Sequence, residues 1–238
     1  MFRVGIPARY GATRLPGKPL ADIEGLPLVL HVYRLAQKSR ASEVVIATDH
    51  EDVRAACSRA GAAVEMTSDR HPSGTDRLAE LAERRKWADD SIVVNVQGDE
   101  PLLPPALIDQ VAALLDADAG ADIATLATPL TSDEEYRNVT VVKVVTRGDR
   151  RALYFSRAAI AGARRHVGLY AYRVRALRRL ASLPPSSLEM QERLEQLRAL
   201  ENGMAIAVDD AREPPGPHVD TEEDLRRVRQ RFAERAGR

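Results

Sequence analysis

The sequence predicts an α/β protein: a mostly parallel sheet flanked by helices, with a smaller lobe of mixed β structure. Up to about residue 121, short continuous apolar runs alternate with segments of helical periodicity. That alternation is typical of βαβ units, whose parallel sheet is covered on both faces. After about Asp122, strand-like runs follow one another with little helix between them. The length of 238 residues suits one large domain, and we expect a single domain over 1–238.

The first half is expected to hold four strands in alternation with four helices. The strands are predicted at 4–7, 44–48, 63–66 and 92–96, and the helices at 28–38, 52–60, 75–85 and 105–116. Each strand is a run of apolar, often β-branched residues, and each helix has apolar residues three and four positions apart. Ligands of such sheets bind beyond the carboxyl ends of the strands, so the loops after these strands are the candidate sites.

In the second half, strands are predicted at 123–129, 141–145, 153–155, 168–172 and 205–208. A helix is expected over 188–202, with Gly203 as its C-terminal cap. The final helix begins at Thr221, which is a suitable N-cap and is followed by three acidic residues in the first turn.

Composition excludes several classes of protein. The 35 basic and 35 acidic residues give a net charge of zero, so no overall field favours nucleic acid or an anionic membrane. Cys57 is the single cysteine and falls on a helical pattern, so we expect a small core residue and no disulfide or thiolate zinc site. The sequence has neither the pattern of a signal peptide nor an apolar run long enough to span a membrane, and we expect a cytoplasmic protein.

A cationic loop follows the first predicted strand, in the segment IPARYGATRLPGKPL at 6–20. Arg9, Arg14 and Lys18 occur there with no acid between them, while Gly11 and Gly17 permit close approach of a ligand or a positive φ. The segment therefore predicts a polyphosphate site. The alternative is a solvated surface turn, because basic runs are usually exposed.

This loop is not a Walker A phosphate loop. That motif needs four residues between its glycines and then Lys followed by Ser or Thr, whereas five residues separate Gly11 from Gly17 and Pro19 follows Lys18. The proline has no N–H to offer a phosphate. A Gly-x-Gly-x-x-Gly dinucleotide turn is absent as well.

Acidic side chains follow two other predicted elements. Asp99 comes directly after the apolar strand at 92–96, so its carboxylate is expected in the ligand crevice, and it is our first candidate for a Mg²⁺ ligand. The alternative is a turn that Asp99 merely caps, and Glu100 beside it is expected to be structural. Asp220 precedes the last helix, where capping is the ordinary role of an acid.

Two further segments carry polar side chains at strand or helix ends. In HPSGTDR at 71–77, backbone groups are placed to bond a nucleobase edge while Ser73 or Thr75 caps the helix; a purely structural role is equally compatible with the pattern. The segments YFSR at 154–157 and HVGLYAYR at 166–173 gather Arg, His and Tyr side chains that suit an anionic polyol.

Eight blocks in order resemble the CMP-KDO synthetases, the 3-deoxy-manno-octulosonate (KDO) cytidylyltransferase family, over nearly the whole chain. They are IPARYGATRLPGKPL, VVIATDHEDV, HPSGTDRLAE, VVNVQGDEPLLP, ALYFSRA, HVGLYAYR, LEQLRALENG and VDTEEDL. The resemblance implies a nucleotidyltransferase fold, usually a homodimer, that uses CTP and Mg²⁺ to join CMP to KDO with release of pyrophosphate. It also implies that 1–121 mainly binds CTP, that 122–220 mainly binds the acceptor and dimerises, and that 221–238 forms a C-terminal helix.

The resemblance further implies the role of each site residue. Arg9, Lys18, Asp99 and Asp220 would be the catalytic residues, and Asp99 and Asp220 would bind Mg²⁺. Residues implied to hold CTP are Ala8, Arg9, Thr13, Lys18, Ser73 and Gly74. Those implied to face the acceptor are Gln97, Arg157, His166, Tyr170, Glu195 and Gln196.

The departures from the family pattern lie on the acceptor side. Only eight residues separate Arg157 from His166, where the family has a longer, proline-containing segment. Thr140 replaces an Asn, and His218 replaces the Gly before Val-Asp. KDO is thus the expected acceptor, CMP transfer to a smaller acid such as a phosphonate is the alternative, and an inactive nucleotide-binding regulatory homologue is an alternative of another class. No nucleic-acid or membrane partner is expected.

Overall fold

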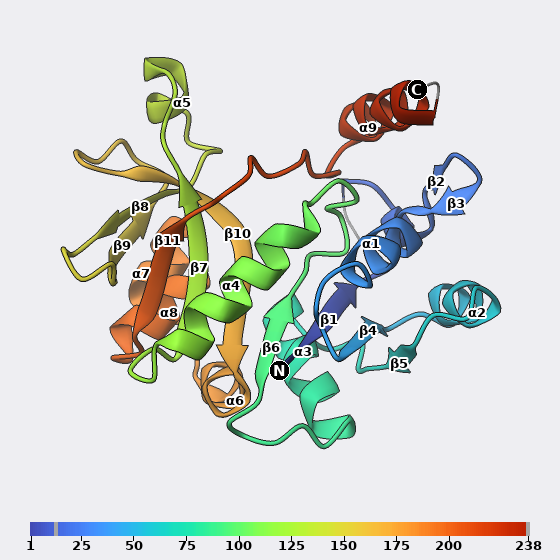
Figure 1. Ribbon diagram of the computed structural model, residues 1–238, viewed down its shortest axis with the longest axis horizontal. Helices are drawn as coiled ribbons and strands as arrows, with labels where there is room; N and C mark the ends of the chain where they lie inside the picture. Colours follow the sequence, from blue (N-terminus) through green and yellow to red (C-terminus); the bar gives the residue numbers. More distant parts are fainter. Residues whose placement is uncertain (12–13, 237–238) are drawn as a thin grey trace.

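The computed structural model describes residues 1–11 and 14–236, and its described part is built on a nine-stranded mixed sheet (Figure 1). The strands of this sheet are β1 (Phe2–Ala8), β4 (Glu43–Thr48), β5 (Val64–Met66), β6 (Ile92–Asn95), β7 (Ile123–Thr128), β8 (Lys143–Thr146), β9 (Ala152–Ser156), β10 (Arg164–Arg173) and β11 (Ile206–Asp210). Their order is β11-β7-β10-β6-β1-β4-β5, and β8 and β9 form a hairpin that pairs with β10. Two short strands, β2 (Asp22–Ile23) and β3 (Leu26–Pro27), pair separately.

The parallel half confirms the four strands predicted in the first part of the chain. β1 pairs in parallel with β4 and with β6, and β4 pairs in parallel with β5. All four strands therefore point their carboxyl ends to the same edge of the sheet, which is the edge where ligands bind in folds of this class.

The mixed lobe continues the same sheet. β10 pairs antiparallel with both β6 and β7, while β11 runs parallel to β7. β10 is longer than the strand predicted at 168–172, and its register against β7 shifts between Val167 and Tyr170. This irregularity re-aims side chains next to the carboxyl end of β6.

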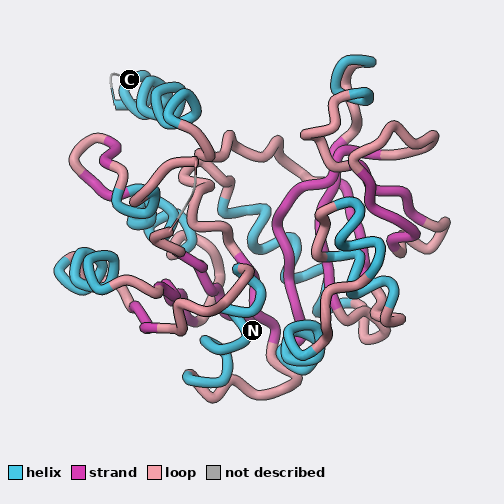
Figure 2. Tube along the Cα trace, turned by 180° about the vertical axis from the view of Figure 1, so that it is seen from behind, coloured by secondary structure: helices cyan, strands magenta, loops and turns pink. Residues whose placement is uncertain are grey.

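Helices cover both faces of the sheet, as Figures 1 and 2 show from opposite sides. They are α1 (Leu28–Ala36), α2 (Glu51–Arg59), α3 (Gly74–Arg84), α4 (Pro105–Ala117), α5 (Asp133–Arg137), α6 (Val174–Ser182), α7 (Ser187–Glu192), α8 (Gln196–Glu201) and α9 (Glu222–Ala236), with a 3₁₀ turn, η1, at Lys18–Leu20. Val94 packs in the core with α1 and α4, whereas its neighbour Val93 packs in the core with α3 and α6. Neighbouring residues of one strand thus face opposite helical layers. Among the described residues, we find no helix with the length and apolarity that a membrane crossing needs.

The helix predicted over 188–202 is wrong in one respect: it is two short helices, α7 and α8. Arg193 between them adopts a left-handed conformation with φ of 55°. A capping box of Ser186 and Glu189 begins α7, and the same Glu189 binds Arg198 of α8, so tertiary contacts fold the segment back on itself.

Helix α6 was not predicted from the sequence. Its apolar residues Val174, Leu177 and Leu180 are buried. The predicted core position of Cys57 is confirmed, since its side chain is fully buried.

A third apolar cluster brings the start of α9 to the N-terminal loop. Val219, Leu225 and Val228 pack there against Ile23 and Leu28. This contact places the residue after Val219 beside the segment that follows β1, although about 200 residues separate them in sequence.

Gly98 fixes the distance between the ends of β1 and β6. A Cβ on this residue would lie 2.6 Å from the carbonyl oxygen of Pro7, a separation that real Cβ atoms essentially never show. We expect Gly98→Ala to lower the free energy of unfolding by about 1–3 kcal/mol, because the strand ends must move apart. Urea unfolding measures the change.

The matched control is Gly148→Ala, since no heavy atom lies within 4 Å of the position of its added Cβ. Equal urea midpoints of unfolding for the two variants would show that the close approach of Gly98 to the Pro7 carbonyl does not affect stability.

Candidate active site

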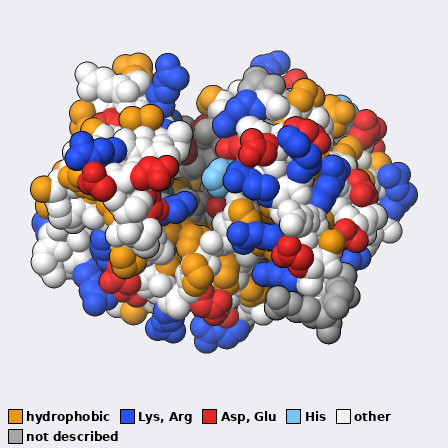
Figure 3. Space-filling model, turned by 90° about the horizontal axis from the view of Figure 1, so that it is seen from above, with side chains coloured by type: hydrophobic (Ala, Val, Ile, Leu, Met, Phe, Trp, Pro, Cys, Tyr) orange, Lys and Arg blue, Asp and Glu red, His pale blue; other side chains and the backbone are white. Residues whose placement is uncertain are grey.

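A cavity of about 290 Å³ lies where β1 and β6 end. Figure 3 looks onto the upper edge of the molecule of Figure 1 and shows a surface hollowed between two lobes, with charged side chains around the hollow. The lining residues are Pro7, Ala8, Arg9, Gly11, Arg14, Lys18, Pro19, Pro72, Ser73, Gly74, Arg77, Gln97, Gly98, Asp99 and Asp220. The structure therefore brings together the cationic loop, the 71–77 segment and both candidate metal ligands.

Lys18 lies between the two acids. Its Nζ is 2.6 Å from Asp99 Oδ2 and 3.2 Å from Asp220 Oδ1. The three side chains are only 17%, 24% and 26% exposed, so these pairs are poorly screened by solvent. Burial by itself would lower the pKa of Lys18, but Asp99 and Asp220 raise it above its ordinary value. Lys18 is thus a firmly charged ammonium group.

Asp220 does not cap α9. Thr221 does so, because its Oγ1 accepts the Asp224 N–H at 3.2 Å. The carboxylate of Asp220 is left to Lys18 and to Arg14, whose guanidinium lies 3.1 Å away. His218, which departs from the family pattern, is 59% exposed and does not line the cavity; its Nε2 is 3.6 Å from Asp220 Oδ2.

The acid pair fits a hard divalent cation. Asp99 Oδ2 and Asp220 Oδ1 both lie within 3.2 Å of one cationic nitrogen, so their oxygens converge on one point. Within residues 1–11 and 14–236, no group of three or more His, Cys, Asp or Glu side chains is placed to hold a metal. Two carboxylates with room for phosphate oxygens and water are the usual protein contribution to a Mg²⁺ site.

The cationic loop is anchored at both ends. The Tyr10 N–H donates to Asp49 Oδ1 at 3.0 Å, and the Tyr10 ring stacks on His50 with 3.7 Å between centroids. Gly17 adopts the predicted positive φ, at 69°, and its N–H donates to the carbonyl of Tyr10. Ala8, Arg9 and Lys18 line the cavity, whereas Thr13 lies outside the described residues.

The start of α3 forms another wall of the cavity. Ser73 is the N-cap, since its Oγ accepts the Asp76 N–H at 3.2 Å. The same Oγ lies 2.8 Å from Glu195 Oε1, and Thr75 Oγ1 donates to Glu195 Oε2 at 2.5 Å. Ser73 and Gly74 are therefore held in place by a residue of the mixed lobe.

Arg77 lines the cavity but was not among the predicted site residues. Its side chain is 1% exposed and donates to Asp49 Oδ2 at 2.7 Å and to Thr67 Oγ1 at 2.6 Å. Asp49 thus joins Arg77 to the cationic loop. The signal in the sequence is an arginine on the apolar side of a predicted helix, directly before Leu78 and four residues before Leu81.

A second, smaller cavity of about 50 Å³ adjoins the first. It is lined by Thr75, Asn95, Gln97, Ile123, Tyr170, Tyr172, Leu180, Glu195 and Gln196. Gln97 lines both cavities. Four of the six residues implied to face the acceptor therefore come together here: Gln97, Tyr170, Glu195 and Gln196.

Apart from Ile123 and Leu180, the residues that line the smaller cavity are polar, and its tyrosines are neutral. Burial raises the pKa of the Tyr170 hydroxyl well above its ordinary value, so this hydroxyl stays protonated. Burial also raises the pKa of Glu195, although its hydrogen bonds from Thr75 and Ser73 act in the opposite direction. No Lys, Arg or His lines this cavity, all of whose lining residues lie in the described part of the chain.

The two other residues implied to face the acceptor lie outside the smaller cavity. The His166 ring packs at 5.3 Å from the Tyr170 ring, its Nε2 is 3.1 Å from Thr125 Oγ1, and burial lowers its pKa to about 3. Arg157 bonds α7 instead, because its Nε donates to the carbonyl of Glu192 at 3.0 Å.

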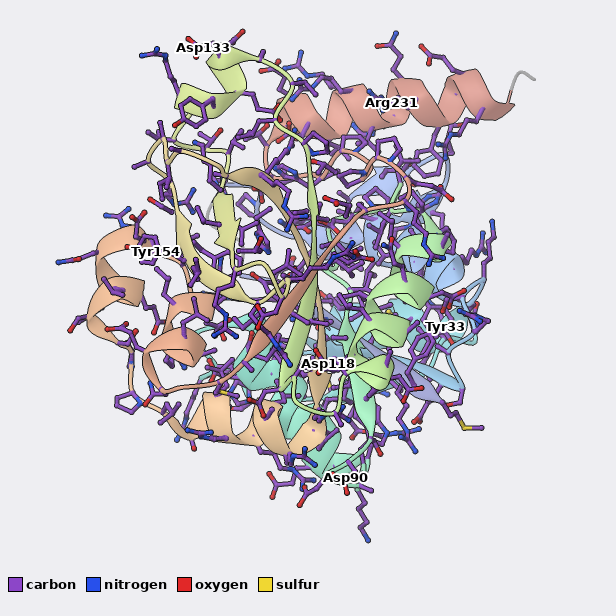
Figure 4. The ribbon with its side chains drawn as sticks, turned by 60° about the vertical axis from the view of Figure 1, so that its left-hand side comes forward. Tyr33, Asp90, Asp118, Asp133, Tyr154 and Arg231 are labelled. Carbon is purple, nitrogen blue, oxygen red and sulfur yellow. The ribbon has the colours of Figure 1, made fainter. Side chains whose placement is uncertain are left out.

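The surroundings of Arg157 explain its placement. Its carbonyl accepts a bond from the buried Lys143 at 3.0 Å, and its backbone N–H donates to Glu192 Oε2 at 2.9 Å. Tyr154 lies against the same helix (Figure 4), with its hydroxyl 3.5 Å from Glu192 Oε1. These hydrogen bonds hold Arg157 against β8 and α7, at the start of the short segment between β9 and β10.

Residues 4–206 match the family model described as cytidylyltransferase. Two relatives are named 3-deoxy-manno-octulosonate cytidylyltransferase: one of Halorhodospira halophila, 51% identical over 97% of this chain and 96% of the relative, and one of Yersinia enterocolitica, 52% identical over 94% and 95%.

Solved structures agree with these relatives. A CMP:2-keto-3-deoxy-manno-octonic acid synthetase complexed with CTP superposes with a TM-score of 0.92, at 39% identity, over 99% of this chain and 100% of that one. A nucleotidyl transferase of Methanothermobacter, 18% identical over 98% of each chain, has a TM-score of 0.64 and shares the fold. The chain therefore belongs to the cytidylyltransferase family, among the 3-deoxy-manno-octulosonate cytidylyltransferases.

Proposed function

We propose that this protein transfers CMP from CTP to KDO and releases pyrophosphate. The observation that carries the proposal is the meeting of Lys18 with Asp99 and Asp220 in a cavity lined by two further arginines of the same loop. This arrangement suits a triphosphate and a divalent cation. The adjoining cavity of hydroxyl, amide and carboxylate groups suits a sugar.

The residues of the cationic loop would neutralise the triphosphate. Arg9 and Lys18, which line the cavity, would bind its phosphates, and Arg14 would join them once it leaves Asp220. Phosphoryl transfer needs little covalent help from the protein, because positioning and charge neutralisation supply most of the rate enhancement. No protein nucleophile is required.

Asp99 and Asp220 would hold Mg²⁺. When bound, the cation would neutralise phosphate oxygens and polarise the reacting groups. Lys18 occupies the position between these carboxylates in the structure, so it must turn toward the phosphates for the acids to bind a metal. Ser73, Gly74 and Arg77 are proposed to face the nucleoside, because they form the opposite wall of the same cavity.

The lining of the smaller cavity favours KDO over a small phosphonate. Its Asn, Gln, Thr, Tyr and Glu side chains match the hydroxyls of a polyol, and a short phosphonate without such hydroxyls would leave these groups without partners. The carboxylate of KDO is attached to the carbon that bears the attacking hydroxyl. It would therefore lie toward the cations of the larger cavity, near the reacting phosphorus.

The shortened segment between Arg157 and His166 leaves the lining of the smaller cavity intact, because no residue of 157–166 contributes to it.

The presence of the predicted catalytic residues in one place argues against an inactive homologue. All four predicted catalytic residues, Arg9, Lys18, Asp99 and Asp220, line one cavity.

We also propose a homodimer in the cytoplasm. The supporting observation for the dimer is on the mixed lobe, where large apolar side chains of Val139, Leu153 and Met190 are 64%, 53% and 64% exposed. Packing these side chains against a second copy of the chain would remove their apolar surface from water.

The acceptor is tested by pyrophosphate release from CTP and Mg²⁺. We expect turnover with KDO and none with short phosphonates or short α-keto acids. Turnover only with a short acid would replace KDO by the alternative acceptor, and the absence of any turnover would favour the regulatory homologue.

Asp99→Asn is expected to lower turnover by about a hundredfold or more, because it removes a carboxylate charge from the metal site while keeping the shape of the side chain. Circular dichroism should show an unchanged fold. The control is Asp90→Asn, at the lower edge of the molecule in Figure 4 and outside both cavities, where the side chain is 83% exposed. Near-normal turnover of Asp99→Asn would remove Asp99 from the metal site.

Lys18→Met is expected to raise the affinity of the nucleotide-free protein for Mn²⁺ by about tenfold, because the ammonium no longer competes for the two carboxylates. The same substitution should weaken CTP binding. Electron paramagnetic resonance of free Mn²⁺ measures the first effect and calorimetry the second. The control is Lys38→Met, at an exposed position outside the cavity; equal Mn²⁺ affinities in the two variants would contradict the competition.

A further inference from the structure

Asn95 is a buried polar residue with an unsatisfied oxygen. Its side chain is 1% exposed, and its Oδ1 has no hydrogen-bond partner. It is the last residue of β6, within a strand whose other residues, Ile92, Val93 and Val94, are apolar and buried. Burying an unpaired carbonyl costs free energy that an apolar side chain of the same size would not cost. A buried oxygen of this kind is usually paired, so a hydrogen-bond donor from a bound molecule is expected to fill the role that no protein group fills.

The position of Asn95 shows where that partner would bind. Asn95 lines the smaller cavity, next to Gln97, and it lies directly opposite Tyr170 in the antiparallel pairing of β6 with β10. The nearby carboxylate of Glu195 already accepts bonds from Thr75 and Ser73. The acceptor oxygen of Asn95 therefore has no hydrogen-bond partner among the residues that line this cavity.

We propose that Asn95 is a specificity residue for the acceptor, and that its Oδ1 accepts a hydrogen bond from an acceptor hydroxyl. This inference rests on the proposed function of the smaller cavity. A hydroxyl can donate to Asn95, whereas an ionised carboxylate or phosphonate has no proton to donate. Asn95 therefore selects polyhydroxylated acceptors over short acids, and it acts through binding alone.

The choice of ligand class follows from the neighbouring groups. Glu195 adds carboxylate oxygens to the same lining, while Gln97 and the neutral Tyr170 hydroxyl can both donate and accept. A cavity with this balance matches hydroxyl groups, each of which donates one proton and accepts others. An apolar or purely anionic occupant has no proton to donate and would leave Asn95 Oδ1 unpaired.

Asn95→Leu tests the proposal through the melting temperature of the free protein and the KM for KDO. A purely structural role of Asn95 predicts different changes in both quantities. Removing the unpaired oxygen should leave the melting temperature of the free protein unchanged or higher. The KM for KDO should rise about tenfold or more, while the dissociation constant for CTP stays within twofold. A purely structural Asn would instead show a lower melting temperature and an unchanged KM.

Gln110→Leu is the matched control, since Gln110 is another buried amide, 5% exposed, on α4 and away from both cavities. Its Nε2 donates to the carbonyl of Asp210 at 2.7 Å, and its Oε1 accepts the Arg212 N–H at 3.0 Å. Because both of its amide groups are satisfied, this variant should melt at a lower temperature with an unchanged KM for KDO.

Singly deoxygenated KDO analogues identify the hydroxyl. The wild-type protein should lose about tenfold in kcat/KM with one analogue, and Asn95→Leu should show no further loss with that analogue. Equal losses in both proteins for every analogue, or an unchanged KM in Asn95→Leu, would overturn the inference and leave Asn95 as the site of a bound water only. Wild-type turnover of KDO in the same assay separates these outcomes from a failure of the proposed function.

Discussion

The contact of one ammonium with two carboxylates constrains the whole molecule. Lys18, Asp99 and Asp220 come from the loop after β1, the end of β6 and the start of α9, yet their charged groups meet within 3.2 Å. Parallel pairing of β1 with β6 brings the first two segments to one edge, and the apolar cluster around Val219 brings the third. Separating these partly buried charges would cost free energy, so their contact opposes any arrangement of the strands and α9 that parts them.

The two cavities differ in the chemical character of their lining residues, and they lie at different halves of the sheet. The larger one gathers cations and acids at the ends of parallel strands. The smaller one gathers uncharged polar groups and the carboxylate of Glu195 beside the antiparallel strand β10. Gln97 lines both cavities. Glu195 joins them by binding Ser73 of one wall and Thr75 of the other. Each cavity therefore has a wall whose residues also support the other cavity.

Sequence patterns predicted the parts of this protein that depend on local chemistry. Continuous apolar runs located the parallel strands, and an acid directly after such a run located Asp99 at the cavity. The patterns failed where distant contacts decide the outcome. The left-handed Arg193 divides a predicted helix because Glu189 binds Arg198, and Arg157 is held at α7 by Glu192. Arg77 and Asn95 were missed for the same reason, since each lies among apolar residues of a regular element and only the fold shows which cavity it lines.

The distance in sequence between Lys18 and Asp220 also determines when the site can form during synthesis. A ribosome-bound chain that has reached α4 already contains β1, β4, β5 and β6, so Lys18 can pair with Asp99 on a locally folded sheet. The second carboxylate, 202 positions after Lys18, emerges only after the mixed lobe has been made. A chain that stops before Asp220 would thus carry the cationic loop with only one of the two carboxylates that are proposed to hold the metal.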